Sequence, residues 1–182
     1  MNQDRRQMTD PRFPSGPLEF KGSALTAEER TAMIEAIAAH PANMRAAVAE
    51  LNDEQLDTPY RDDGWTVRQV VHHVVDSHLN SYQRFKLALT EGKPTIRTYD
   101  QAAWAELPEA KAAPVEVSLA LLEALHVRWV MMLRDMEGSD FEKLLDHPEV
   151  GDISADQLLE IYGWHCPHHE GHITALRDRM GW

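Results

Sequence analysis

Apolar residues recur at helical intervals in two long segments of the chain. In residues 67–90, the apolar positions near one helical face are Val67, Val70, Val71, Val74, Phe85 and Leu89. In residues 114–138, the corresponding positions are Val117, Leu121, Leu125, Trp129, Met132 and Met136. Because residues three or four positions apart share one face of an α-helix, each segment predicts an amphipathic helix with a buried apolar face.

Helix starts are marked by capping boxes, in which a Ser or Thr hydroxyl and a Glu or Gln three residues later satisfy free backbone N–H groups. The pattern occurs at Thr26 with Glu29, at Thr66 with Gln69, and at Ser154 with Gln157. It predicts helices that begin after residues 26, 66 and 154, and the last runs towards residue 179. Because Pro41 removes a hydrogen bond from the first helix, we expect a break or kink there, with the helix resuming from Met44 to Leu51.

Proline and glycine are frequent in residues 1–25, where they interrupt any helical or strand period and predict an extended N-terminal arm. Residues 26–182 are expected to form one domain, since 182 residues suit a single hydrophobic core. No segment shows sustained alternation of apolar and polar residues between turn signals, so strands are not required. Four amphipathic helices predict an all-α fold, a four-helix bundle.

Composition limits the partners and the compartment. The net charge of −12 disfavours nucleic acid and anionic lipid surfaces. No apolar stretch approaches the roughly 18 residues of a membrane span, and the charged first residues lack the apolar segment of a secretory signal. The single cysteine, Cys166, forms no intramolecular disulfide, so we expect a reducing compartment and a cytoplasmic protein.

Histidines gather in two groups, and ten are present in all. One group is His72, His73 and His78, and the other is His165, His168, His169 and His172. His165 and His169 are four residues apart, which places their imidazoles on adjacent turns of one helical face. Spacing alone leaves other pairs open, because His168 and His172 fall within the same arc. Pro167 lies between the pair, and we expect the helix to bend there.

A further ligand would come from the helix at residues 67–90. His72 and His73 point about 100° apart, so at most one of them faces a shared site. Three imidazoles suit Zn²⁺ or Ni²⁺ and leave a coordination position open, as in catalytic sites. Asp76, one turn from His73, could orient an imidazole or accept a proton. The competing interpretations are histidines that are solvated or satisfied within the core, and a solvated helix acid at Asp76.

Several ordered segments resemble the DinB superfamily, in particular its YfiT-like branch. They are GWTVRQVVHHVVDSHLNSYQRFKLALTEGKPTI, WHCPHHEGHI, RFPSGPLEF, LNDEQLDTPYR and LLEALHVRW. The resemblance implies an up-down-down-up bundle, a three-histidine site for a divalent metal, and often a homodimer. The family's ligand positions match His73 in HVVD and His165 and His169 in WHCPHH, and leave His72 outside the site.

The resemblance implies an enzyme that acts on a small-molecule substrate. Family members are described as metal-dependent hydrolases, and related members transfer low-molecular-weight thiols such as bacillithiol or mycothiol. The HExxH pattern of metalloproteases is absent, because Glu170 stands in HHEGH, and this slightly favours thiol transfer. Cys166 is expected to be a small buried residue and not the nucleophile. The alternative function is a non-catalytic metal-binding or protein-interaction module.

Overall fold

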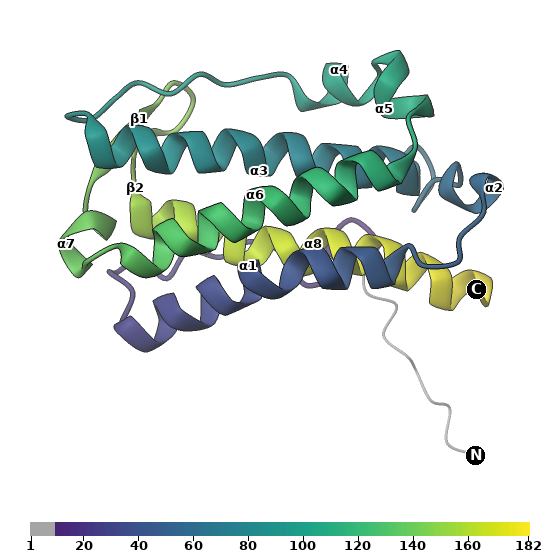
Figure 1. The fold of residues 1–182 in the computed structure, drawn as a ribbon, viewed down its shortest axis with the longest axis horizontal. Helices are drawn as coiled ribbons and strands as arrows, with labels where there is room; N and C mark the ends of the chain where they lie inside the picture. The colour runs from purple at the N-terminus through teal and green to yellow at the C-terminus, as the bar shows by residue number, and fades with distance from the viewer. Residues whose placement is uncertain (1–9) are drawn as a thin grey trace.

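Four long helices pack lengthwise in the computed structural model, which describes residues 10–182 (Figure 1). They are α1 (Ala27–Ala47), α3 (Val67–Thr90), α6 (Val115–Asp135) and α8 (Ala155–Met180). The shorter elements are α2 (Asp53–Leu56), α4 (Gln101–Ala105), α5 (Pro108–Ala112), α7 (Gly138–Phe141), β1 (Leu144–His147) and β2 (Gly151–Ser154). Among the described residues, no helix is both long and apolar enough to span a bilayer.

The long helices follow an up-down-down-up order, because α1 and α8 run in one direction and α3 and α6 in the other (Figure 1). Helix α1 packs against α6 and α8, and α3 packs against the same two helices. Since α3 and α6 are parallel, residues 91–114 must return along the bundle, and they carry α4 and α5 along α3. The predicted all-α four-helix bundle is thus confirmed.

The capping boxes fix the starts of three long helices. The hydroxyls of Thr26, Thr66 and Ser154 accept from the backbone N–H three residues later, and the reciprocal side-chain bonds are present. Helix α3 spans Val67–Thr90 as predicted. Helix α1 continues through Pro41 without a break and ends at Ala47, short of the predicted Leu51. Tertiary packing of α1 on both α6 and α8 offsets the lost hydrogen bond.

Sequence periodicity placed the buried face of α6 wrongly in its first half. Val117 and Leu121 are 64% and 45% exposed. The buried apolar residues of α6 are Val115, Leu119, Leu122, Leu125, Trp129, Val130 and Leu133. Apolar residues occur on more than one face of this helix, so spacing alone does not identify the face that meets the core.

The end of α6 and the following segment also differ from the prediction. Pro114 is the N-cap of α6, which ends at Asp135, and Gly138 begins the short helix α7. Strands β1 and β2 then form an antiparallel hairpin in which Leu145 is paired with Ile153. Both side chains are buried in the core. Each strand has four residues, which is too short for alternation to be recognised in the sequence.

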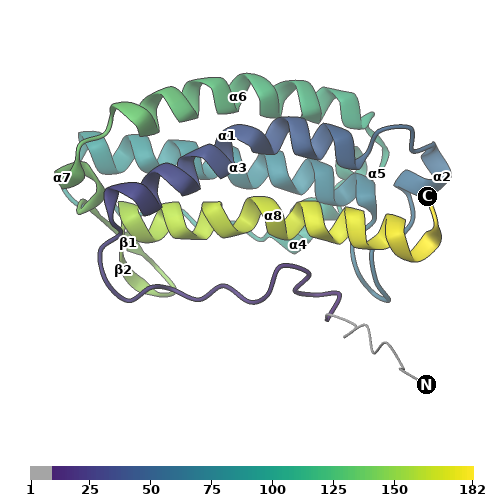
Figure 2. The ribbon, with the colours of Figure 1, turned by 90° about the horizontal axis from the view of Figure 1, so that it is seen from below.

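The N-terminal segment lies along α8 in the opposite direction (Figure 2). Trp164 Nε1 donates to the Gly16 carbonyl at 2.9 Å, and the backbone N–H of Leu25 donates to Asp156 Oδ2 at 3.1 Å. Between them, the Lys21 N–H donates to Glu160 Oε2 at 3.1 Å. The segment therefore follows one long helix of the bundle, while residues 1–9 of the expected arm lie outside the described residues.

Gly163 on α8 lies close to Met33 on α1. A Cβ at this position would lie 2.9 Å from Met33 Cγ and 3.1 Å from Met33 Cβ. We expect Gly163→Ala to lower the free energy of unfolding by about 1–2 kcal/mol, because overpacking outweighs the gain in helix propensity. Urea denaturation measures the change. Gly92→Ala is the control, since a Cβ there meets nothing within 4 Å, and equal stability of the two variants would contradict the expected clash.

Candidate metal centre

Buried histidines form a layer across the middle of the bundle, between two apolar clusters. Ile37 and Trp129 belong to the cluster at one end, and Met44 and Leu122 belong to the cluster at the other. The histidines of the layer are His40 from α1, His73 and His78 from α3, His126 from α6, and His165 and His169 from α8. Burying so many polar rings in a core is costly unless they are paired or bind a ligand, so the layer indicates a function.

Three of these histidines meet at one point. Potential ligand nitrogens of His73, His165 and His169 all lie within 4.8 Å of one another. His165 Nε2 and His169 Nε2 are 3.1 Å apart. The three side chains are 5%, 9% and 6% exposed. Helix α8 contains Pro167 without interruption, so the proline leaves the two rings of α8 on a common face.

The structure distinguishes His73 from its neighbour His72. The His72 ring turns towards α6, where Nδ1 lies 2.7 Å from Ser118 Oγ and Nε2 lies 3.2 Å from the Ala113 carbonyl. The His73 ring instead contacts Trp65, with ring centroids 4.6 Å apart. This is the geometry expected from the 100° between adjacent helical positions.

His168 and His172 remain close to the same site. Together with His169 they form a second group whose ligand atoms lie within 4.8 Å of one another. The His168 ring stacks on Trp164 at a centroid distance of 4.1 Å, and the His172 ring stacks on Tyr60 at 4.0 Å. These stacking contacts hold both rings at the edge of the histidine layer.

Burial keeps the three central imidazoles neutral. It lowers the pKa of His73 to about 4, with further contributions from the positive charges that His172 and His168 could carry. Burial likewise lowers the pKa values of His165 and His169 far below the usual range, and neighbouring histidines add to the effect. Neutral imidazole is the form that binds metal ions. At neutral pH the site therefore presents nitrogen lone pairs and no positive charge.

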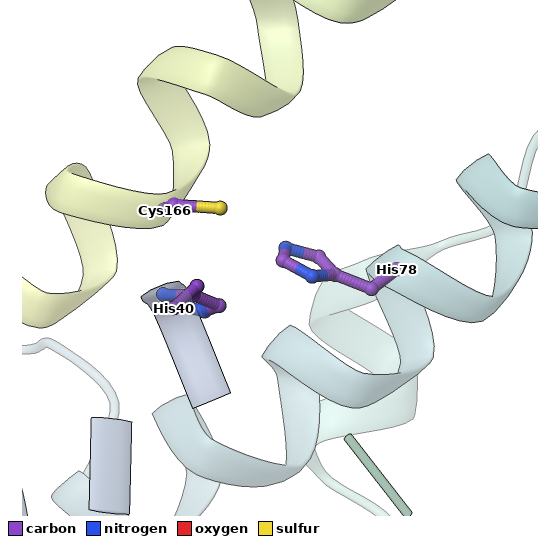
Figure 3. A group of neighbouring side chains, drawn as sticks. All are labelled: His40, His78 and Cys166. Atoms are coloured by element: carbon purple, nitrogen blue, oxygen red, sulfur yellow. The ribbon is translucent and has the colours of Figure 1, made fainter. Parts of the chain in front are cut away.

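Sequence reasoning did not single out His40, which forms another group with His78 and Cys166 (Figure 3). These side chains come from α1, α3 and α8, and all three are buried. His40 Nδ1 lies 2.5 Å from Glu170 Oε1, while His40 Nε2 has no hydrogen-bond partner among residues 10–182. The sequence signal available was a histidine at helical spacing between Ile37 and Met44, which is weak by itself.

Cys166 is 1% exposed. Burial raises the pKa of its thiol well above the usual value, and the negative charge of Glu170 makes a smaller contribution in the same direction. A reactive cysteine is exposed and has a lowered pKa, so Cys166 has the character of the small buried residue that was expected.

Asp76 is half-buried on α3, one turn beyond His73. Burial, with a smaller contribution from Glu109, raises the pKa of its carboxyl group to about 6. Within residues 10–182 its carboxylate makes no hydrogen bond that would fix it against an imidazole. Its role as a partner of His73 stays a prediction, but its pKa suits an acid or base that acts near neutral pH.

Fold and site together define a helical-bundle protein with a buried polyhistidine centre. The chain belongs to the DinB superfamily, whose family model matches residues 36–173. This confirms the family that the sequence motifs had indicated.

Relatives and a solved structure cover nearly the whole chain. A Bacillus cereus protein named "Putative metal-dependent hydrolase" is 51% identical over 175 residues, which are 96% of this chain and 100% of the relative. A Bacillus mycoides protein with a similar name is 50% identical over 175 residues, again 96% of this chain and 100% of the relative. YfiT from Bacillus subtilis, described as "a probable metal-dependent hydrolase with an unusual four-helix bundle topology", matches with a TM-score of 0.91 and 47% identity. That match covers 94% of this chain and 98% of YfiT.

Proposed function

We propose that His73, His165 and His169 hold a divalent metal ion and that the protein is a metal-dependent enzyme acting on a small molecule. The carrying observation is the convergence of three neutral, buried imidazoles from two helices within 4.8 Å. Ligand nitrogens of a tetrahedral zinc ion are about 3.3 Å apart, as zinc–nitrogen bonds of about 2.0–2.1 Å require. The 3.1 Å between His165 Nε2 and His169 Nε2 is close to this spacing.

When bound, a divalent ion with an open coordination position supplies Lewis acidity that lowers the pKa of a water or a thiol. The protein would hold the ligand imidazoles in place and surround the site with apolar side chains. Trp65 packs on the His73 ring, and the apolar clusters on both sides limit competing water. The ligand set favours Zn²⁺ or Ni²⁺, because neutral imidazole suits both ions.

Hydrolysis and thiol transfer are the two reactions that fit this site. Glu170 contacts His40 and Asn43, so it is held away from the role that the glutamate has in HExxH enzymes. Asp76 is the carboxylate that we propose as proton acceptor. In the hydrolase it would take a proton from water, and in the transferase from a bacillithiol-type thiol. The names of the relatives support hydrolysis.

We also propose a cytoplasmic homodimer. Cytoplasmic location is supported by the single cysteine, which is typical of proteins in reducing compartments. Homodimer formation is supported by exposed apolar side chains on α6, namely Val117, Leu121, Val127 and Met131. Light scattering on the purified protein gives the subunit number, and a monomer at micromolar concentration would contradict the dimer.

Parallel assays of ester hydrolysis and of thiol conjugation test the proposed enzyme. Each is run on chelator-treated protein, with and without added zinc, nickel or manganese. We expect at least one activity to disappear on chelation and to return with one of the metals. A protein that binds metal and turns over neither class of substrate would instead be the non-catalytic metal-binding module.

Replacing Asp76 separates its effect on stability from its effect on activity. Because burial raises the pKa of this carboxyl group to about 6, ionisation above that pH destabilises the fold. We expect Asp76→Asn to raise the free energy of unfolding at pH 7.5 by about 1 kcal/mol, and the gain to disappear near pH 4, where both side chains are neutral. Activity should fall at least about tenfold if Asp76 transfers the proton.

Denaturation at the two pH values and kcat measurements check both effects. Asp76→Ala is the comparison for activity, because it removes the oxygen atoms as well as the charge. Full activity of both variants would remove Asp76 from the mechanism.

A further inference from the structure

A chain of hydrogen-bonded histidines leads away from the candidate metal position. His165 Nδ1 lies 3.0 Å from His78 Nε2, and His78 Nδ1 lies 2.7 Å from His126 Nε2. His126 Nδ1 then lies 2.7 Å from the backbone carbonyl oxygen of Ile37. The chain crosses the bundle from α8 through α3 and α6 to α1, and all its side chains are buried.

The carbonyl at the end of this chain fixes the position of every proton in it. A carbonyl oxygen only accepts, so His126 Nδ1 carries the hydrogen and donates to Ile37. A neutral imidazole has one N–H, so His126 Nε2 accepts from His78 Nδ1. By the same rule, His78 Nε2 accepts from His165 Nδ1. His165 Nε2 is left with a lone pair, and its contact with a hydroxyl, that of Ser77 Oγ, is long at 3.5 Å.

A shorter chain of hydrogen bonds fixes the proton position of His169, the other proposed ligand on α8. His172 Nε2 lies 3.3 Å from the carbonyl oxygen of Arg12, and must donate to it. His172 Nδ1 lies 3.3 Å from His169 Nδ1, and so accepts its hydrogen. His169 Nε2 therefore also has a free lone pair, and it faces that of His165 at 3.1 Å. Two lone pairs at this distance repel each other, and a cation between them removes the repulsion.

We propose that His78, His126 and His172 are positioning residues that hold His165 and His169 in the tautomer whose Nε2 lone pairs point at the metal. This inference rests on the proposed metal site and adds the residues that prepare it. Hydrogen-bond partners of this kind fix the orientation of a metal-ligating histidine and increase its basicity. Through the Arg12 carbonyl, which accepts from His172, the N-terminal segment also helps to orient His169.

Two features separate this role from alternatives. His78 also belongs to the group with His40 and Cys166 (Figure 3), but both of its nitrogens are already hydrogen-bonded, so it is not free to bind a second ion. The longer chain ends on a carbonyl, which takes up no proton, so the chain orients the ligand and does not conduct protons.

Nitrogen NMR of the metal-free protein, labelled with ¹⁵N in its histidines, tests the tautomers directly. At pH 7.5 we expect the hydrogen on Nδ1 of His126, His78, His165 and His169, and on Nε2 of His172. In His126→Phe, where the end of the longer chain is lost, His165 should become a mixture of tautomers while His169 is unchanged. A hydrogen on Nε2 of His165 or His169 in the wild type would overturn the inference.

Zinc affinity, measured by competition with a chelator, tests the consequence. We expect His78→Phe to weaken binding about 10–100-fold, the loss usual for partners of metal ligands. His40→Phe is the matched control, because it removes an equally buried imidazole of the same layer that belongs to neither chain, and its affinity should stay within about twofold of the wild type.

The two experiments separate the inference from the proposed function. If the wild type binds zinc but His78→Phe and His40→Phe have equal affinities, the positioning role is wrong and the metal site stands. If the wild type binds no divalent metal, the metal site is wrong and the positioning role falls with it, whatever the NMR shows.

Discussion

His73→Ala is expected to leave the purified protein without its metal, whereas His72→Ala retains it. His73 supplies the α3 nitrogen of the cluster, and no other residue of α3 is grouped with His165 and His169. Loss of a direct ligand should cost more than the 10–100-fold typical of an outer partner, so we expect affinity to fall by a factor of about 1,000 or more.

The neighbouring variant controls for loss of a buried imidazole. His72 is 4% exposed and hydrogen-bonded to Ser118 and Ala113, so His72→Ala should lower stability without changing metal content. Elemental analysis of both variants, purified in parallel, gives the answer. Equal metal content in the two would show that His73 is not a ligand.

Acid is expected to unfold the metal-free protein steeply, between about pH 6.5 and 4. Burial lowers the pKa of His73, His126, His168 and His172 to about 4, from an ordinary value of 6.5. In this range the unfolded chain binds protons that the folded chain does not, so stability is retained above pH 6.5 and is lost as the pH falls towards 4. Each such histidine contributes about 1.4 kcal/mol per pH unit.

If two to four histidines act together, the free energy of unfolding should fall by about 3–6 kcal/mol per pH unit. Most of the stability of a typical domain, about 5–15 kcal/mol, would be lost near pH 5. Urea titrations at several pH values measure this slope. His168→Gln should reduce it by about one proton, and saturating zinc should move the acid midpoint to lower pH because the ion binds the folded form. A slope near zero would contradict neutral, buried histidines in the fold.

The parts of the fold that local chemistry determines could be predicted from the sequence. The hydroxyls of Thr26, Thr66 and Ser154 satisfy backbone groups within one helical turn, so the starts of α1, α3 and α8 are encoded locally. The exposed face of α6 at Val117 and Leu121 could not be predicted, because the packing of neighbouring helices selects the buried face.

The candidate site likewise has a part that could be predicted from the sequence and a part that could not. Helical spacing showed that histidines of two helices could meet, but it left open whether His168 or His172 would join His165. The motif around each ligand selected His73, His165 and His169, and the structure brings these three together. The contact of His40 with Glu170 and the chain through His78 depend on how four helices pack, so neither has a signature in the sequence.

Anomalous diffraction from crystals grown with zinc, collected on both sides of the zinc absorption edge, tests the metal site most directly. We expect one strong peak per chain within about 2.0–2.1 Å of His165 Nε2, His169 Nε2 and a ring nitrogen of His73. A peak beside His40, His78 and Cys166, or none inside the bundle, would contradict the site.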